Sequence, residues 1–182
     1  RADQKRLNNA GLVLYHGIHL EGKMGDLLAR IAESSGKDRH IFAVAEVVDK
    51  KELISNELFG DYPDPHLWFD LQLWKLCSAE IGKALQKADP ANAASYAAAT
   101  EAYLAKVEET HQWALTRIKE LPAEKRKVVT SHDAYNYFAR AYGFEVKGLQ
   151  GISTVTRPGL QRIRAAVKYI RENELSVIFA ET

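Results

Sequence analysis

The sequence has few of the residues that would place it in several common classes of protein. Its 182 residues include one cysteine, Cys77, which excludes an intrachain disulfide and a zinc site built from several thiolates. The 25 basic residues nearly balance the 24 acidic ones, so no net positive field exists to hold a nucleic-acid backbone, and no nucleic-acid partner is expected. No apolar run approaches the roughly 18 residues that a membrane-spanning helix needs.

Short motifs with a familiar chemistry are also missing. The chain has no Gly-rich phosphate loop, Walker sequence, HExxH, CxxC or EF-hand loop. Ser131-His132-Asp133 contains the residue types of a catalytic triad, but neighbours in sequence cannot point at one another as nucleophile, base and orienting group must. Functional residues must therefore be gathered by the fold from distant parts of the chain.

The chain does contain a regular alternation of strand and helix patterns. Short apolar runs predict strands at 12–15, 41–44, 128–130, 144–146 and 177–180, the last with the pattern of a buried strand. Helical spacing of apolar residues predicts helices from 24 to a stop at Gly36, from 67 to 85, from 135 to 142 and from 163 to 170. This order predicts an α/β fold with mainly parallel sheets.

One helix is expected to be unusually long. Asp89-Pro90 is a typical helix start, and no helix-breaking residue follows before Pro122. A helix over 91–121 would be roughly 45 Å long, more than the diameter of a small domain. We interpret it as a strut, which divides the chain into an N-terminal lobe (1–88), a linking helix (89–121) and a C-terminal lobe (122–182).

Three of the six histidines share a position relative to the predicted elements. His19, His66 and His132 each lie in a segment that leads into a helix, and two of them follow directly on a predicted strand. That end of an open α/β sheet is where ligands bind. Imidazole is a good ligand for Zn²⁺ and other divalent first-row metals, so the three histidines are candidate metal ligands. The alternative is that each is a capping or packing residue.

The other histidines and the cysteine give weaker indications of a function. His111 lies in the apolar stripe of the long helix and is expected to be a hydrogen-bonded interface residue, and His40 is expected to be structural. His16 is either a donor behind the site or a solvent-facing side chain. Cys77 is expected to be buried and inert.

At this point the sequence resembles a known family, the metal-binding receptors of ABC transporters for zinc, manganese and iron, in particular the TroA-type receptors. The matching stretches, each with a recognisable motif, are 12–21, 64–70, 130–144 and 147–154. The resemblance covers essentially the whole chain.

The resemblance implies two α/β lobes joined by one rigid helix, with a metal ion between the lobes. It assigns three ligands to His19, His66 and His132, and a fourth, a carboxylate, to a position beyond Thr182. We therefore expect the chain to be an incomplete receptor, truncated at both ends. The resemblance also implies a monomeric, periplasmic or membrane-anchored extracytoplasmic protein that delivers its metal to an ABC permease and catalyses no reaction.

The expected metal is Zn²⁺, with Mn²⁺ as the second candidate. In the resembled family, a histidine in the third position is typical of zinc and of mixed zinc/manganese receptors, which favours zinc for His132. The family's dedicated zinc receptors carry a His-rich loop, which is absent between Ala45 and Pro65, and this favours the mixed type. Three neutral imidazoles suit Zn²⁺ better than Mn²⁺.

Two other functions remain open at this level. A three-histidine zinc hydrolase would need an open coordination position for water and a general base such as Glu21. An adhesin or interaction module could share the fold without the metal function.

Overall fold

The computed structural model describes residues 6–7, 9–34, 40–55, 62–150 and 159–180. The predicted helix stop at Gly36 lies outside these residues. The chain divides into two compact units, which are described separately: unit 1 is Arg1–Leu53 with Leu71–Thr110, and unit 2 is Ile54–Asp70 with His111–Thr182. The lobe boundaries inferred from the sequence stay a prediction.

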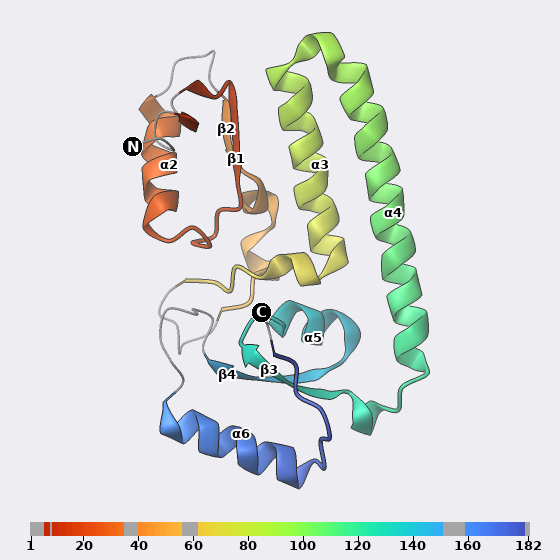
Figure 1. The fold of residues 1–182 in the computed structure, drawn as a ribbon. Helices are drawn as coiled ribbons and strands as arrows, with labels where there is room; N and C mark the ends of the chain where they lie inside the picture. The colour runs from red at the N-terminus through yellow and green to blue at the C-terminus, as the bar shows by residue number, and fades with distance from the viewer. Residues whose placement is uncertain (1–5, 8, 35–39, 56–61, 151–158, 181–182) are drawn as a thin grey trace. The chain divides into compact units, whose positions relative to one another are not determined.

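Unit 1 is built on a two-stranded parallel sheet. Strands β1 (Leu12–Tyr15) and β2 (His40–Ala43) pair in register from Leu12 with His40 to Tyr15 with Ala43. Helices α2 (Lys23–Ser34) and α3 (Leu71–Ala88) both contact β2, and Figure 1 shows the sheet lying between them. The chain leaves β2 directly into a 3-10 turn, η1, whose Val44 and Ala45 are buried. The predicted strands and helix of this unit are confirmed.

Helix α3 and the first part of α4 (Ala93–Lys119) form an antiparallel hairpin within unit 1 (Figure 1). The two helices approach closely at Gly82, where an added Cβ would overlap Thr100 Oγ1 and lie 2.7 Å from its Cγ2. The Thr100 hydroxyl donates a 2.7 Å hydrogen bond to the Tyr96 carbonyl, which fixes its rotamer. Glycine is therefore needed here for packing.

We expect Gly82→Ala to lower the free energy of unfolding by about 1–3 kcal/mol, because the added methyl group overpacks the contact with Thr100. The matched control is Gly25→Ala in α2, where the added Cβ would meet only Glu21 Cβ at an ordinary 3.8 Å. That change should raise stability, by up to about 1 kcal/mol, since alanine is the better helix former. Chemical denaturation of the two variants measures both; equal effects would contradict the packing argument.

Helix α4 contributes residues to both units and has 27 residues. The predicted helix over 91–121 is thus largely confirmed, except that Pro90–Asn92 forms a 3-10 turn before α4 begins. None of the helices in the described part of the chain is both long and apolar enough to cross a membrane.

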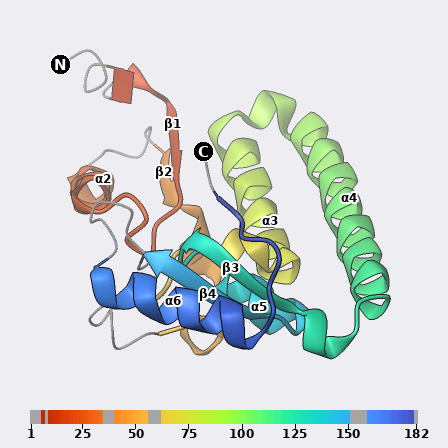
Figure 2. The same cartoon turned by 60° about the horizontal axis from the view of Figure 1, so that its bottom comes forward.

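Unit 2 has a second two-stranded parallel sheet. Strands β3 (Lys127–His132) and β4 (Glu145–Gln150) pair with Thr130 opposite Gly148 and His132 opposite Gln150. Helices α5 (Asn136–Tyr142) and α6 (Leu160–Glu172) both contact β4, and the sheet lies between them in Figures 1 and 2. The largest fully buried side chains of the unit include Tyr137, Leu67 and Val129.

Three predictions from the sequence need correction. Helix α3 begins at Leu71, because Leu67–Phe69 forms a 3-10 turn. His132 is the last residue of β3 instead of a loop residue. The buried strand predicted at 177–180 is wrong: within the described residues the pairing is a single bridge between Thr130 and Phe179, and Val177, Ile178 and Phe179 are all more than half exposed. Strand propensity reflects packing against neighbours, and no described element covers these side chains.

Candidate metal site

The loop that carries His19 has an unusual backbone. After β1, Gly17, Ile18 and His19 have φ angles of 85°, 49° and 60°, all in the left-handed region. That region is costly for a β-branched residue such as Ile18, and strained backbone concentrates at functional sites. Ile18 is buried, whereas the His19 side chain is exposed. The loop therefore buries its apolar side chain and presents its histidine.

Glu21 holds this loop in shape. Its carboxylate accepts hydrogen bonds from the backbone N–H of His16 at 2.6 Å and of Gly17 at 3.1 Å. The His16 carbonyl in turn accepts from Ala45 N at 2.9 Å, which ties the loop to η1. Gly17 cannot be replaced without strain, since an added Cβ would lie 2.9 Å from the Cβ of Ala43.

His66 is positioned in unit 2 by a buried network around Asp64. Asp64 Oδ1 lies 2.7 Å from His66 Nδ1 and accepts the His66 backbone N–H at 3.0 Å, while Oδ2 accepts from Asn136 Nδ2 at 2.9 Å. The Tyr137 hydroxyl donates to the Asp64 carbonyl at 2.8 Å and accepts from Ile54 N at 3.0 Å. Asp64 and Tyr137 are both 0% exposed, and burial raises the pKa of Tyr137 to about 12.

His132 is positioned by strand β3. It is half-buried at the end of the strand, and its ring meets that of His66 with centroids 5.2 Å apart and planes inclined at 64°. The next residue, Asp133, accepts the Gly148 N–H at 3.0 Å, and burial is the main cause of its raised pKa. Two histidines that are 66 positions apart in the sequence therefore meet edge to face.

The structure thus brings together two of the three predicted ligands, His66 and His132, within unit 2. His19 belongs to unit 1 and is described with that unit alone. Among the described residues, no group of three or more His, Cys, Asp or Glu side chains is assembled in position to hold a metal ion. A three-histidine site therefore requires His19 to join the pair of unit 2, and this remains a prediction.

The remaining candidates are placed as follows. His111 Nδ1 lies 3.0 Å from the Tyr142 hydroxyl, so the expected hydrogen bond is present. Cys77 is fully buried, and burial raises the pKa of its thiol to about 11, which agrees with an inert role. His40 stacks on Phe42 within unit 1. His16 is half-buried in the loop before His19.

Sequence reasoning missed Asp64, Asn136 and Tyr137 as parts of the site. A local indication was available only for Asp64, because an aspartate two residues before His66 can accept that residue's backbone N–H. Asn136 and Tyr137 reach Asp64 across 72 and 73 residues of sequence, a pairing that only the fold establishes.

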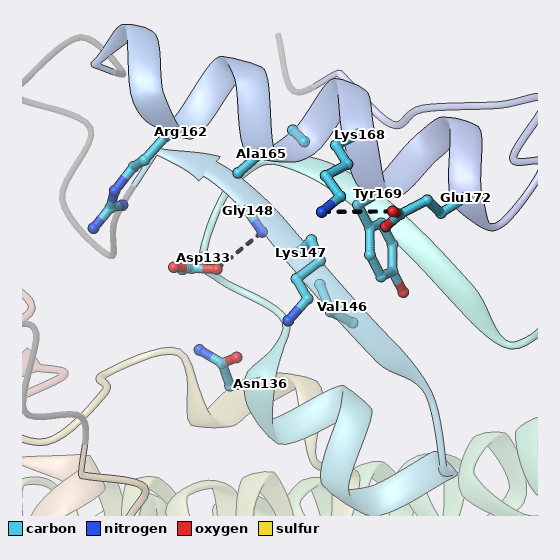
Figure 3. A pocket seen from close by; sticks show the side chains of 11 residues that line it. Asp133, Asn136, Val146, Lys147, Gly148, Arg162, Ala165, Lys168, Tyr169 and Glu172 are labelled. Carbon is cyan, nitrogen blue, oxygen red and sulfur yellow. Dashed lines mark hydrogen bonds and ion pairs between the residues drawn. The ribbon is translucent and has the colours of Figure 1, made fainter.

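A cavity of about 570 Å³ lies between β4 and α6 of unit 2 (Figure 3). Its charged lining residues are Lys147, Arg162, Lys168, Asp133 and Glu172. Lys168 Nζ is 3.6 Å from Glu172 Oε1, and the Asp133 carboxylate is engaged by the Gly148 N–H. Cationic groups outnumber carboxylates in its lining, so this cavity is a poor site for a divalent metal ion.

Comparison with known proteins extends over the whole chain. Residues 1–182 match the family described as "Zinc-uptake complex component A periplasmic". The chain is 38% identical over 183 residues to the manganese-binding lipoprotein MntA of Bacillus subtilis (strain 168), covering 100% of this chain and 58% of that protein. It is 36% identical over 180 residues to the zinc-binding protein TroA of Treponema pallidum (strain Nichols), covering 99% of this chain and 56% of that protein.

Solved structures agree. The periplasmic zinc-binding protein TroA from Treponema pallidum superimposes with a TM-score of 0.90 at 35% identity, covering 98% of this chain and 62% of that chain. The chain therefore spans less than two thirds of the length of these relatives. The α/β fold with parallel sheets and a long helix is confirmed, as is the resemblance inferred from the four sequence motifs. The chain belongs to the family described as the periplasmic component A of the zinc-uptake complex.

Proposed function

We propose that the protein is a metal receptor of an ABC transporter, which captures a divalent transition metal outside the cytoplasmic membrane and delivers it to a membrane permease. Family membership over all 182 residues supports this role, as do relatives whose names state zinc and manganese binding. We further propose that it acts as a monomer, in the periplasm or anchored to the outer side of the membrane, and that His19, His66 and His132 are the ligands.

The observation that carries the proposal is the separation of the two imidazole rings. Two imidazoles on one tetrahedral Zn²⁺, with Zn–N bonds of about 2.0–2.1 Å, have ring centroids about 5 Å apart. The rings of His66 and His132 are 5.2 Å apart, a separation that supports the proposal that both bind one ion. The Asp64 contact to His66 Nδ1 leaves Nε2 of that ring as the nitrogen available to a metal.

Zn²⁺ is the proposed metal, with Mn²⁺ as the second candidate. Imidazole suits zinc well, and zinc binds more tightly than manganese to a given nitrogen site by the general order of affinities. The relatives include a zinc-binding and a manganese-binding protein at nearly equal identity, so their names do not separate the two metals.

The structure disfavours the role that a zinc hydrolase would give to Glu21. A general base must be available to take a proton from water. The Glu21 carboxylate instead accepts two backbone N–H groups of its own loop, at 2.6 and 3.1 Å. Glu21 is thus a structural residue of the loop that presents His19.

A competition titration of the metal-free, full-length protein with a chromophoric chelator tests the proposal. We expect one Zn²⁺ to bind per chain, more tightly than Mn²⁺, and we expect the zinc-loaded protein to leave activated ester and phosphate substrates intact. Turnover that is lost in His66→Ala would favour the hydrolase instead. Partner binding that persists in a His19→Ala, His66→Ala double variant, together with absent zinc binding in the unmodified protein, would favour an interaction module.

Metal retention should depend on pH. A histidine ligand must be neutral, and free imidazole takes up a proton near pH 6.5, so protons compete with the metal as the pH falls. We expect the full-length protein to hold its zinc at pH 7 and to lose most of it by about pH 5, as measured by dialysis against buffers across that range. Retention that stays flat between these values would argue against a histidine site.

A further inference from the structure

We propose that Asp64 is the positioning residue of the metal site, and that together with Asn136 it fixes His66 in the tautomer that presents Nε2 to the metal. This inference rests on the proposed function and deepens it. Asp64 is fully buried, and both of its carboxylate oxygens have partners in unit 2. Three contacts engage its two oxygens in this arrangement, so we assign it to positioning His66 and not to binding the metal.

The hydrogen bonds around Asp64 determine which nitrogen of His66 carries the proton. Oδ1 accepts the backbone N–H of His66 and lies 2.7 Å from its Nδ1, while Oδ2 faces the side-chain amide of Asn136 at 2.9 Å. A carboxylate can only accept, so Asn136 must present its NH₂ group and His66 must carry a proton on Nδ1. The lone pair of a neutral His66 ring is then on Nε2.

The network also restricts rotation of the ring. A single contact to Nδ1 would leave the carboxylate free to swing, but Asn136 holds the second oxygen from the first turn of α5. The backbone of Asp64 is fixed independently, because its N–H donates to the Ile54 carbonyl at 2.8 Å and its carbonyl accepts from Tyr137. Ring orientation, tautomer and increased basicity of Nε2 are the contributions that such a carboxylate makes to a bound metal.

Two variants of the full-length protein test this role. Asp64→Asn keeps the size of the side chain but offers an amide to Nδ1, and we expect the Kd for Zn²⁺ to rise roughly 10–100-fold. Asn136→Ala removes one donor to Asp64 and should raise the Kd less, about fivefold. The matched control is Asp89→Asn in unit 1, since the partners of Asp89 Oδ2 are also an asparagine (Asn92) and a tyrosine (Tyr96), neither of which is a proposed ligand. It should leave the Kd unchanged.

The tautomer of His66 in the metal-free protein distinguishes the two roles that Asp64 could have. It changes in Asp64→Asn if Asp64 positions the ring, and stays the same if Asp64 only stabilises the fold. Long-range ¹⁵N–¹H NMR spectra at pH 8 should show Nδ1 protonated and Nε2 unprotonated in the unmodified protein, and a gain of the other tautomer in Asp64→Asn. A ring protonated on Nε2 in the unmodified protein would overturn the inference, whatever the variants do. So would Asp64→Asn binding zinc as tightly as the unmodified protein.

Failure of the positioning role can be distinguished from failure of the proposed function. If the unmodified full-length protein binds no zinc, the metal-receptor proposal fails, and the His66 tautomer still reports whether Asp64 positions the ring. If the unmodified protein binds zinc and Asp64→Asn shows only a lower melting temperature, with unchanged tautomer and unchanged Kd, the receptor proposal stands and the positioning role is refuted.

Discussion

Replacing His66 by alanine is expected to weaken zinc binding by at least about 100-fold. Loss of a partner behind a metal ligand already costs 10–100-fold in affinity, and loss of the ligand itself should cost no less. His66 is 6% exposed, and its ring lies against both His132 and Asp64, so its loss leaves a buried gap beside the proposed site. Competition titration of the full-length protein with a zinc chelator measures the change.

The control for this variant is His111→Ala. His111 also belongs to unit 2, is half-buried and has a ring nitrogen 3.0 Å from a tyrosine hydroxyl, that of Tyr142. Its removal deletes an imidazole and a hydrogen bond, as in His66→Ala. Zinc affinity should stay within about twofold, since the lost hydrogen bond and ring contact are to Tyr142, which is not a proposed ligand. If both variants lost affinity equally, the loss would be due to general destabilisation, and His66 would not be a ligand.

Tyr137→Phe is expected to lower the free energy of unfolding by about 2–4 kcal/mol. The Tyr137 hydroxyl is buried and serves two backbone groups, the Asp64 carbonyl and the Ile54 N–H. Its removal leaves both groups without this partner in the interior, and each buried, unsatisfied group costs about 1–3 kcal/mol. Chemical denaturation of the metal-free, full-length protein measures the loss.

Tyr96→Phe is the matched control for Tyr137→Phe. The Tyr96 hydroxyl also donates to an aspartate, with 3.0 Å to Asp89 Oδ2, but this pair is accessible to water, which can replace the lost bond. We expect little change in stability. If the two tyrosine variants behaved alike, the argument from the buried network around Asp64 would be wrong.

Much of the fold could be predicted from local sequence patterns. The runs at 12–15 and 128–130 and the glycine after α5, Gly143 with φ 71°, are local features, and the structure has strands and a helix end at these places. The long helix was predictable for the same reason, because a helix start followed by a long stretch without a breaker depends only on neighbouring residues.

The features that could not be predicted depend on residues far apart in the chain. Val177, Ile178 and Phe179 have the composition of a buried strand, but whether such a run pairs and is covered depends on its neighbours in space. The same holds for the site. A histidine after Asp64-Pro65 is visible in the sequence, whereas its approach to His132 and the support from Asn136 follow from the packing of unit 2.

The most direct test of the central claim is metal analysis of the full-length protein purified without chelator. We predict about one equivalent of zinc or manganese per chain in the unmodified protein, and almost none in a His19→Ala, His66→Ala, His132→Ala triple variant purified in parallel. An unmodified protein that carries neither metal, or a triple variant that retains as much as the unmodified protein, would contradict the assignment of these three histidines to a metal receptor.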